Sequence, residues 1–127
     1  MNQPIPSKIK LHKQSQLLEL HFGDEQFLLP AEFLRVQSPS AEVKGHGPGQ
    51  EVLQFGKKDV AINQLERAGN YALKLVFSDG HGTGIYTWSY LYELGKNHEQ
   101  LWNDYLRKLH DAGKSREIDT SVVKFIH

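Results

Sequence analysis

The residues best suited to chemistry lie in one glycine-rich loop, at positions 78–84. The loop reads Ser-Asp-Gly-His-Gly-Thr-Gly, so glycines alternate with polar side chains. Glycine tolerates positive φ and lets the backbone approach a ligand or another chain segment closely. Asp79 and His81 are suitable ligands for iron or zinc, and either side chain can transfer a proton. The loop also precedes a helical pattern, and backbone N–H groups at the start of a helix favour anions.

A second glycine-rich segment, at positions 38–49, has the same character. Polar connectors of this length are often functional or mobile in compact domains. If the two loops meet in space, His46 and His81 could share a ligand. The alternative is structural, with Asp79-Gly80 as a turn, His81 hydrogen-bonded to the body and the second segment as a solvated connector. The candidate metal ligands are His81, His46 and Asp79, and the candidate binding-loop residues are Ser38, Ser40, Gly80, Gly82 and Gly84.

Familiar catalytic and metal-binding motifs are absent from the sequence. The chain has no cysteine, which excludes thiolate catalysis and every cysteine-based zinc site. No two of its seven histidines are three or four residues apart, the spacing that places two ligands on one helix face. The run Gly113-Lys114-Ser115 fails as a phosphate-binding loop because Lys108 stands at the position of its first glycine. The chain is therefore predicted not to be an enzyme, and a small hydrolase or isomerase is the least favoured function.

The composition points to one globular domain, with the cytoplasm as the expected location. With 127 residues, 39% of them hydrophobic, the chain can bury a core without disulfides or a metal. Fifteen basic residues balance fifteen acidic ones, so the chain lacks the net positive field of nucleic-acid binders. The N-terminus lacks the apolar run of a signal peptide, and no segment approaches the roughly 20 apolar residues of a membrane span. We expect no nucleic-acid partner and no membrane insertion.

The first part of the chain shows the period-two pattern of strands. A strand is predicted over 8–12, and Leu18, Leu20 and Phe22 share one face of the next. A turn at 23–25 leads to a strand over 26–29, and Pro30 is placed to start a helical turn over 31–35. Further strands are predicted over 51–55, 60–65 and 71–77, the last two joined by a turn at Gly69-Asn70, with Tyr71, Leu73, Leu75 and Phe77 on one face.

The last third of the chain changes to a helical period. Apolar residues at i, i+3 and i+4 predict a helix over 88–94 that ends at Gly95. A longer helix follows, with Asn97 as N-cap, Gln100 completing a capping box and Gly113 at its end. Its expected buried stripe, with Asp104 and Lys108 paired on the exposed side, comprises Leu101, Trp102, Tyr105, Leu106 and Leu109.

These elements predict an α+β fold, a small β-rich domain of antiparallel strands and hairpins followed by two C-terminal helices. The domain is predicted to span residues 1–113, and residues 114–127 form a polar C-terminal tail. The tail contains one apolar run, Val-Val-Lys-Phe-Ile at 122–126. Disorder, an added strand and a docking peptide are the alternatives for this run, and ordering on contact is favoured over a fixed core strand.

Several motifs of the chain, taken together, resemble one known family. They are Phe33-Leu34-Arg35, Ser38-Pro39-Ser40-Ala41-Glu42-Val43, Gly45-His46, Gly69-Asn70-Tyr71-Ala72, Asp79-Gly80-His81, Gly84-Ile85-Tyr86-Thr87-Trp88 and Leu91. In this combination the chain resembles the DUF971 family, also called the gamma-butyrobetaine hydroxylase-like N-terminal domain. The resemblance covers about residues 5–112, nearly the whole predicted domain.

The resemblance has an implication for metal binding at the two loops. In the eukaryotic hydroxylases this domain precedes the catalytic dioxygenase domain and binds a structural zinc through three cysteines and one histidine. By motif, these ligands fall at Ser38, Ser40, Val43 and His81 in this chain. Valine cannot coordinate zinc and serine is a poor ligand, so only His81 keeps a suitable donor. The resemblance thus implies a lost zinc site, and the dioxygenase domain has no counterpart in the sequence.

The resemblance also implies a context in iron–sulfur metabolism, because similar domains are fused to Mrp/ApbC-type P-loop ATPases that carry iron–sulfur clusters. The leading hypothesis is therefore a non-catalytic accessory module that docks on such a protein partner through the two loops. The alternative is a metal-binding domain that holds iron or zinc at His81 with His46 or Asp79. Iron and zinc are the cofactors that these hypotheses involve.

Overall fold

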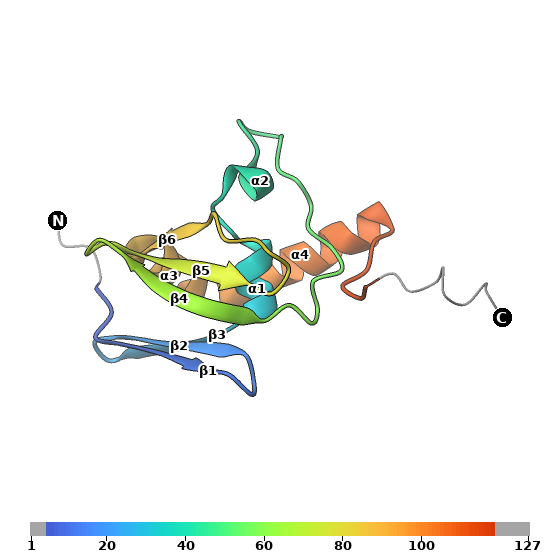
Figure 1. Cartoon of the computed structure of the whole chain (residues 1–127). Coiled ribbons are helices and arrows are strands. Elements are labelled where there is room, and N and C mark those ends of the chain that lie inside the picture. The colour runs from blue at the N-terminus through green and yellow to red at the C-terminus, as the bar shows by residue number, and fades with distance from the viewer. Residues whose placement is uncertain (1–4, 119–127) are drawn as a thin grey trace.

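The computed structural model describes residues 5–118 and shows two antiparallel three-stranded sheets with helices beside them (Figure 1). The first sheet has the strand order β1-β2-β3 and the second the order β4-β5-β6. The strands are β1 (Lys8–His12), β2 (Leu17–Phe22), β3 (Glu25–Pro30), β4 (Ile62–Ala68), β5 (Ala72–Phe77) and β6 (Ile85–Thr87). The helices are α1 (Ala31–Val36), α2 (Ala41–Lys44), α3 (Trp88–Lys96) and α4 (His98–Ala112). The α+β fold that ends in two helices is confirmed.

The main core lies between the two sheets and helix α3. One cluster joins Leu18 and Leu20 of β2, Leu75 and Phe77 of β5, and Leu91 of α3. In Figure 1 the second sheet lies above the first, and α1 and α3 lie behind them. Alternate residues of β2 are buried, as the period-two pattern predicts for a sheet with one covered face.

The segment before the second sheet differs most from the prediction. No strand forms over 51–55, and β4 begins at Ile62 rather than at residue 60. Backbone groups of 51–55 have partners outside any ladder: the N–H of Val52 donates to the carbonyl of Val43, and the hydroxyl of Tyr105 donates to the carbonyl of Gln54. Tyr71 precedes β5 and is 61% exposed, so it does not share the buried face of that strand.

Helix α3 passes through Gly95 and ends at Lys96, so the predicted stop at Gly95 is wrong. The glycine serves packing instead: a Cβ added there would lie 2.5 Å from the ring of Phe27 on β3. The predicted capping box at Asn97 is also wrong, because the Asn97 side chain donates back to the Glu93 carbonyl of α3. Gly113 ends α4 in the left-handed conformation, as predicted.

The stripe on α4 is narrower than the sequence indicates. Tyr105 and Leu109 are buried, whereas Leu106 is exposed. Asp104 pairs with Arg107 at 3.0 Å, and its predicted partner Lys108 lines a groove beside α4 instead. Within residues 5–118 no helix has the length and apolar character needed to cross a bilayer.

The first residues of the predicted tail lie against the domain. Backbone N–H groups of Gly56 and Lys58 donate to the carbonyls of Ser115 and Arg116. The Arg116 guanidinium donates two hydrogen bonds, at 2.8 and 2.7 Å, to the buried carboxylate of Glu32 in α1. The boundary at 113 stays a prediction, and the apolar run at 122–126 lies outside the described residues.

Candidate functional site

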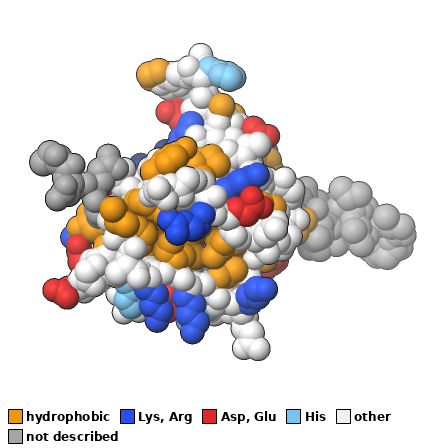
Figure 2. All heavy atoms as spheres, turned by 60° about the vertical axis from the view of Figure 1, so that its left-hand side comes forward, with side chains coloured by type: hydrophobic (Ala, Val, Ile, Leu, Met, Phe, Trp, Pro, Cys, Tyr) orange, Lys and Arg blue, Asp and Glu red, His pale blue; other side chains and the backbone are white. Residues whose placement is uncertain are grey.

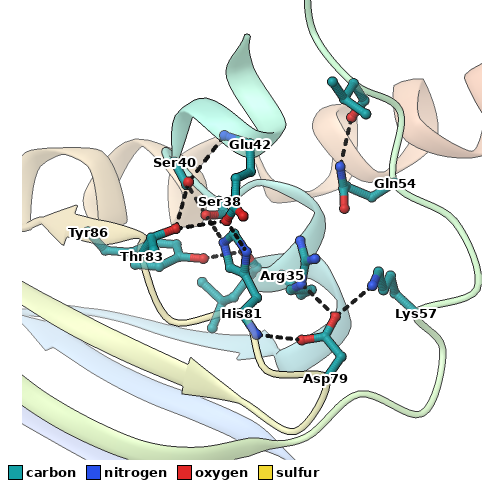
Figure 3. A network of polar contacts seen from close by, with 12 residues as sticks. Arg35, Ser38, Ser40, Glu42, Gln54, Lys57, Asp79, His81, Thr83 and Tyr86 are labelled. Carbon is teal, nitrogen blue, oxygen red and sulfur yellow. Dashed lines mark hydrogen bonds and ion pairs between the residues drawn. The ribbon is translucent and has the colours of Figure 1, made fainter.

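The two glycine-rich loops meet in the structure (Figure 3). Ser38 Oγ lies 2.8 Å from His81 Nε2, and Ser40 Oγ lies 2.8 Å from the Thr83 hydroxyl. Thr83 also donates to the Glu42 carboxylate at 3.0 Å. Short helix α2 starts here because the Ser40 side chain accepts a hydrogen bond from the Glu42 N–H, the usual role of an N-cap serine. Predicted site residues Ser38, Ser40 and His81 are therefore neighbours.

The His81 side chain is buried within this cluster. Its Nε2 contacts Ser38 Oγ, and its Nδ1 lies 3.2 Å from the Glu42 carboxylate. Burial, and then the positive charge of Arg35, lower the pKa of His81 below its ordinary value. Both ring nitrogens thus have partners, and the environment favours the neutral imidazole.

Asp79 makes a separate set of contacts on the other side of the loop. Its Oδ2 accepts hydrogen bonds from Arg35 Nε at 2.9 Å and from Lys57 Nζ at 2.6 Å. Its Oδ1 accepts one from the His81 backbone N–H at 3.2 Å. Burial alone would raise the pKa of Asp79, but the hydrogen bonds from Lys57, His81 and Arg35 outweigh it and hold the pKa at about 2. Asp79 therefore ties the loop to α1 and to the segment that carries Lys57.

Arg35 is the buried centre of this second network. Its residue is only 6% exposed, and its Nε is bonded to Asp79. Its Nη1 is buried without a hydrogen-bond partner among residues 5–118. A buried donor without a partner destabilises the folded state. A buried positive charge also needs a negative partner, and the Asp79 carboxylate provides it for Arg35.

The three glycines of the loop have different surroundings. A Cβ at Gly84 would lie 2.5 Å from Ser38 Oγ, so this glycine lets the two loops touch. Gly80 has φ +89°, a conformation that disfavours other residues. Gly82 has room, since its Cβ would make ordinary contacts of 3.7 Å with Val76.

The predicted metal ligands do not form a common set of donors. His46 is exposed, and both ring nitrogens of His81 face other side chains. The Asp79 carboxylate is already paired with the basic side chains of Arg35 and Lys57. Nowhere in the described part of the chain do three His, Asp or Glu side chains form a group able to hold a metal ion. The zinc ligand positions implied by the resemblance do not fit zinc either, because Ser38 is hydrogen-bonded to His81 and the buried side chain of Val43 has no atom that could bind a metal.

A groove beside the loops was not predicted from the sequence. It has a volume of about 580 Å³ and lies between α4 and the segments around α2 and residues 51–54. Its buried and half-buried apolar side chains are Val36, Val43, Leu53, Leu101 and Tyr105. The charged side chains that line it are Lys44, Glu51, Asp104 and Lys108. Burial, and then the nearby Lys108, lower the pKa of Lys44.

The fold and these contacts define a small α+β domain whose candidate site is a hydrogen-bonded loop junction beside an apolar groove. The family model of the gamma-butyrobetaine hydroxylase-like N-terminal domain matches residues 9–92. The chain therefore belongs to this family.

Several solved structures are similar to the chain, three of them over 71–99% of its length. Two are solution structures determined by NMR. One is 56% identical with a TM-score of 0.83, covering 99% of this chain and 100% of its own. The other is 49% identical with a TM-score of 0.78, covering 92% and 88%.

The third is a crystal structure from Acidithiobacillus ferrooxidans, described as a protein of unknown function of the DUF971 family. It is 34% identical with a TM-score of 0.55, covering 71% of this chain and 91% of its own. None of the curated proteins matches this chain.

Proposed function

We propose that this domain is a non-catalytic binding module, which docks an amphipathic segment of a partner protein in the groove beside α4. The observation that carries the proposal is the composition of the groove. Apolar side chains such as Leu53 and Tyr105 line it together with both positive and negative charges. Peptide-binding grooves typically combine apolar contact with polar groups that select the partner.

The loop junction supports a structural role beside that groove. Ser38, His81 and Glu42 follow one another in the order of a hydrolase triad. However, Ser38 is fully buried, and neither Ser38 nor His81 lines the groove. A nucleophile must reach its substrate, so this geometry favours stabilisation of the loops over hydrolysis.

The nature of the partner comes from the resemblance to the family rather than from the geometry. Domains of this kind joined to Mrp/ApbC-type ATPases suggest an iron–sulfur carrier as the partner, and a role in iron–sulfur or iron metabolism. Without cysteines the chain would contact the carrier and leave the cluster to it. We place this encounter in the cytoplasm.

Direct titration tests the proposal. Purified iron–sulfur carrier ATPase is titrated into the wild type, into Val52→Asp at the groove and into Leu28→Asp on β3 as a matched control. Both residues are about half exposed, at 52% and 45%, but only Val52 lines the groove. We expect wild type and Leu28→Asp to bind alike and Val52→Asp to bind at least tenfold more weakly. Equal binding by all three proteins, or no binding by the wild type, would contradict the proposal.

A further inference from the structure

The described chain ends close to one wall of the groove. Ser115 follows α4 in the chain, and its carbonyl accepts a hydrogen bond from the backbone N–H of Gly56 at 2.9 Å. A Cβ added at Gly56 would lie 3.6 Å from the Glu117 carbonyl oxygen and 3.9 Å from Ile118 Cα. Gly56 follows Gln54, a groove residue, by two positions. Ile118 therefore lies beside the segment that forms the groove wall.

The anchoring of Arg116 fixes this exit point. Its guanidinium donates to both carboxylate oxygens of Glu32 and lies 5.1 Å from the centre of the Trp102 ring. Bidentate pairs with a buried carboxylate are strong and directional. The end of the described chain is thus held against α1 and α4, the helices that contribute Val36 and Tyr105 to the groove.

The residues beyond Ile118 match the groove in chemistry. They include the apolar run Val-Val-Lys-Phe-Ile at 122–126, whose lysine matches the acidic groove residues Glu51 and Asp104. The nine residues 119–127 span up to about 30 Å when extended. Their exit point lies beside Gly56, which is only two positions from the groove residue Gln54.

We propose that residues 119–127 dock in the groove beside α4 and compete there with the partner segment. The competition rests on the function proposed above, whereas the docking of the chain's own segment does not. An intramolecular segment has a high effective concentration, so even weak apolar contacts keep it in place until a better ligand arrives. The groove would then bind its partner only after the segment leaves.

NMR spectra of the methyl groups test the docking without any partner. The wild type is compared with a chain truncated after Ile118 and with Phe125→Asp, while Thr120→Asp supplies a matched charge outside the apolar run. We expect the methyl signals of Val43, Leu53 and Leu101 to shift on truncation and with Phe125→Asp, and to stay in place with Thr120→Asp. A synthetic peptide of residues 119–127 should restore the wild-type positions when added to the truncated chain.

Two outcomes would overturn the docking of this segment. The first is a truncated chain whose groove methyl signals equal those of the wild type. The second is a shift that depends on protein concentration, which would assign the groove to a second copy of the chain. The partner titration is read separately: truncation should increase affinity for the ATPase several-fold. If the methyl signals shift but the affinity for the ATPase is unchanged, residues 119–127 dock in the groove without competing with the partner.

Discussion

Ser38 Oγ lies 2.8 Å from His81 Nε2, although the two residues are 43 positions apart in the chain. Glu42 lies near the other ring nitrogen of His81, so the three side chains follow one another as serine, histidine and carboxylate do in a catalytic triad. Its fully buried serine has no access to a substrate. The junction therefore holds the two loops together by the same polar groups that an enzyme would use for chemistry.

Replacing Ser38 with alanine should destabilise the protein without changing any ester hydrolysis. The buried His81 nitrogen would lose its partner, at a cost of about 1–3 kcal/mol in the free energy of unfolding. Chemical denaturation and an assay with an activated ester measure the two quantities. Ester turnover by the wild type that disappears in Ser38→Ala would show the structural interpretation to be wrong.

Replacing Gly84 with alanine should disrupt the loop junction, whereas the same change at Gly82 should not. The added methyl group at Gly84 would lie 2.5 Å from Ser38 Oγ, and overpacking of this kind costs about 1–3 kcal/mol. At Gly82 the methyl group meets only ordinary contacts with Val76, so we expect a change below about 0.5 kcal/mol. Thermal denaturation of the two variants makes the comparison, and equal effects would argue against a close junction at Gly84.

The Asp79 carboxylate should stabilise the fold in a pH-dependent way. Its pKa is about 2 in the folded protein, below its ordinary value of 3.8. The stabilisation is therefore complete above about pH 4 and is lost as the pH falls through the folded pKa. At neutral pH we expect Asp79→Asn to lose about 2 kcal/mol, because Arg35 would lack a charged partner.

Urea denaturation of the wild type and Asp79→Asn, repeated from pH 7 to pH 2, measures this difference. The gap between the two proteins should stay constant down to about pH 4 and then narrow. Because other groups titrate alike in both proteins, the comparison isolates Asp79. A gap that is constant down to pH 2 would contradict the depressed pKa.

The metal hypothesis predicts stoichiometric iron or zinc, whereas the observed contacts predict none. His81 is hydrogen-bonded to Ser38, and the Asp79 carboxylate is paired with two basic side chains. We therefore expect purified protein without a histidine tag to contain no stoichiometric metal. A chelator should leave its thermal unfolding unchanged. Elemental analysis decides the question. Bound metal that is absent from His81→Ala would revive the metal site.

The alternation of apolar and polar residues predicted the strands that have one covered face, but not the segments whose partners are distant in the sequence. The alternation of Leu18, Leu20 and Phe22 was sufficient to place β2 and its hairpin, because one face of the sheet is covered. The residues at 51–55 have strand-like composition but find no neighbouring strand, since their backbone partners come from Val43 and Tyr105. Such long-range partners have no signature in a single sequence.

The candidate site was predictable only in part, for the same reason. Glycine content and residue type indicated that the two loops are special, and the resemblance indicated that Ser38 and His81 belong together. The links from Asp79 to Arg35 and Lys57 were missed, because arginine and lysine are common on ordinary surfaces. The groove was missed because it forms only when α4 packs beside the segment at 51–54.

The contact between Gly95 and Phe27 has a consequence for how the family can vary. Alanine is normally the better residue inside a helix, by roughly 1 kcal/mol. Here the aromatic ring of β3 occupies the space that a methyl group would need. The two positions should therefore covary in size among homologues, with a larger residue at 95 accompanied by a smaller one at 27, so that the spacing between α3 and the first sheet is inherited as a pair.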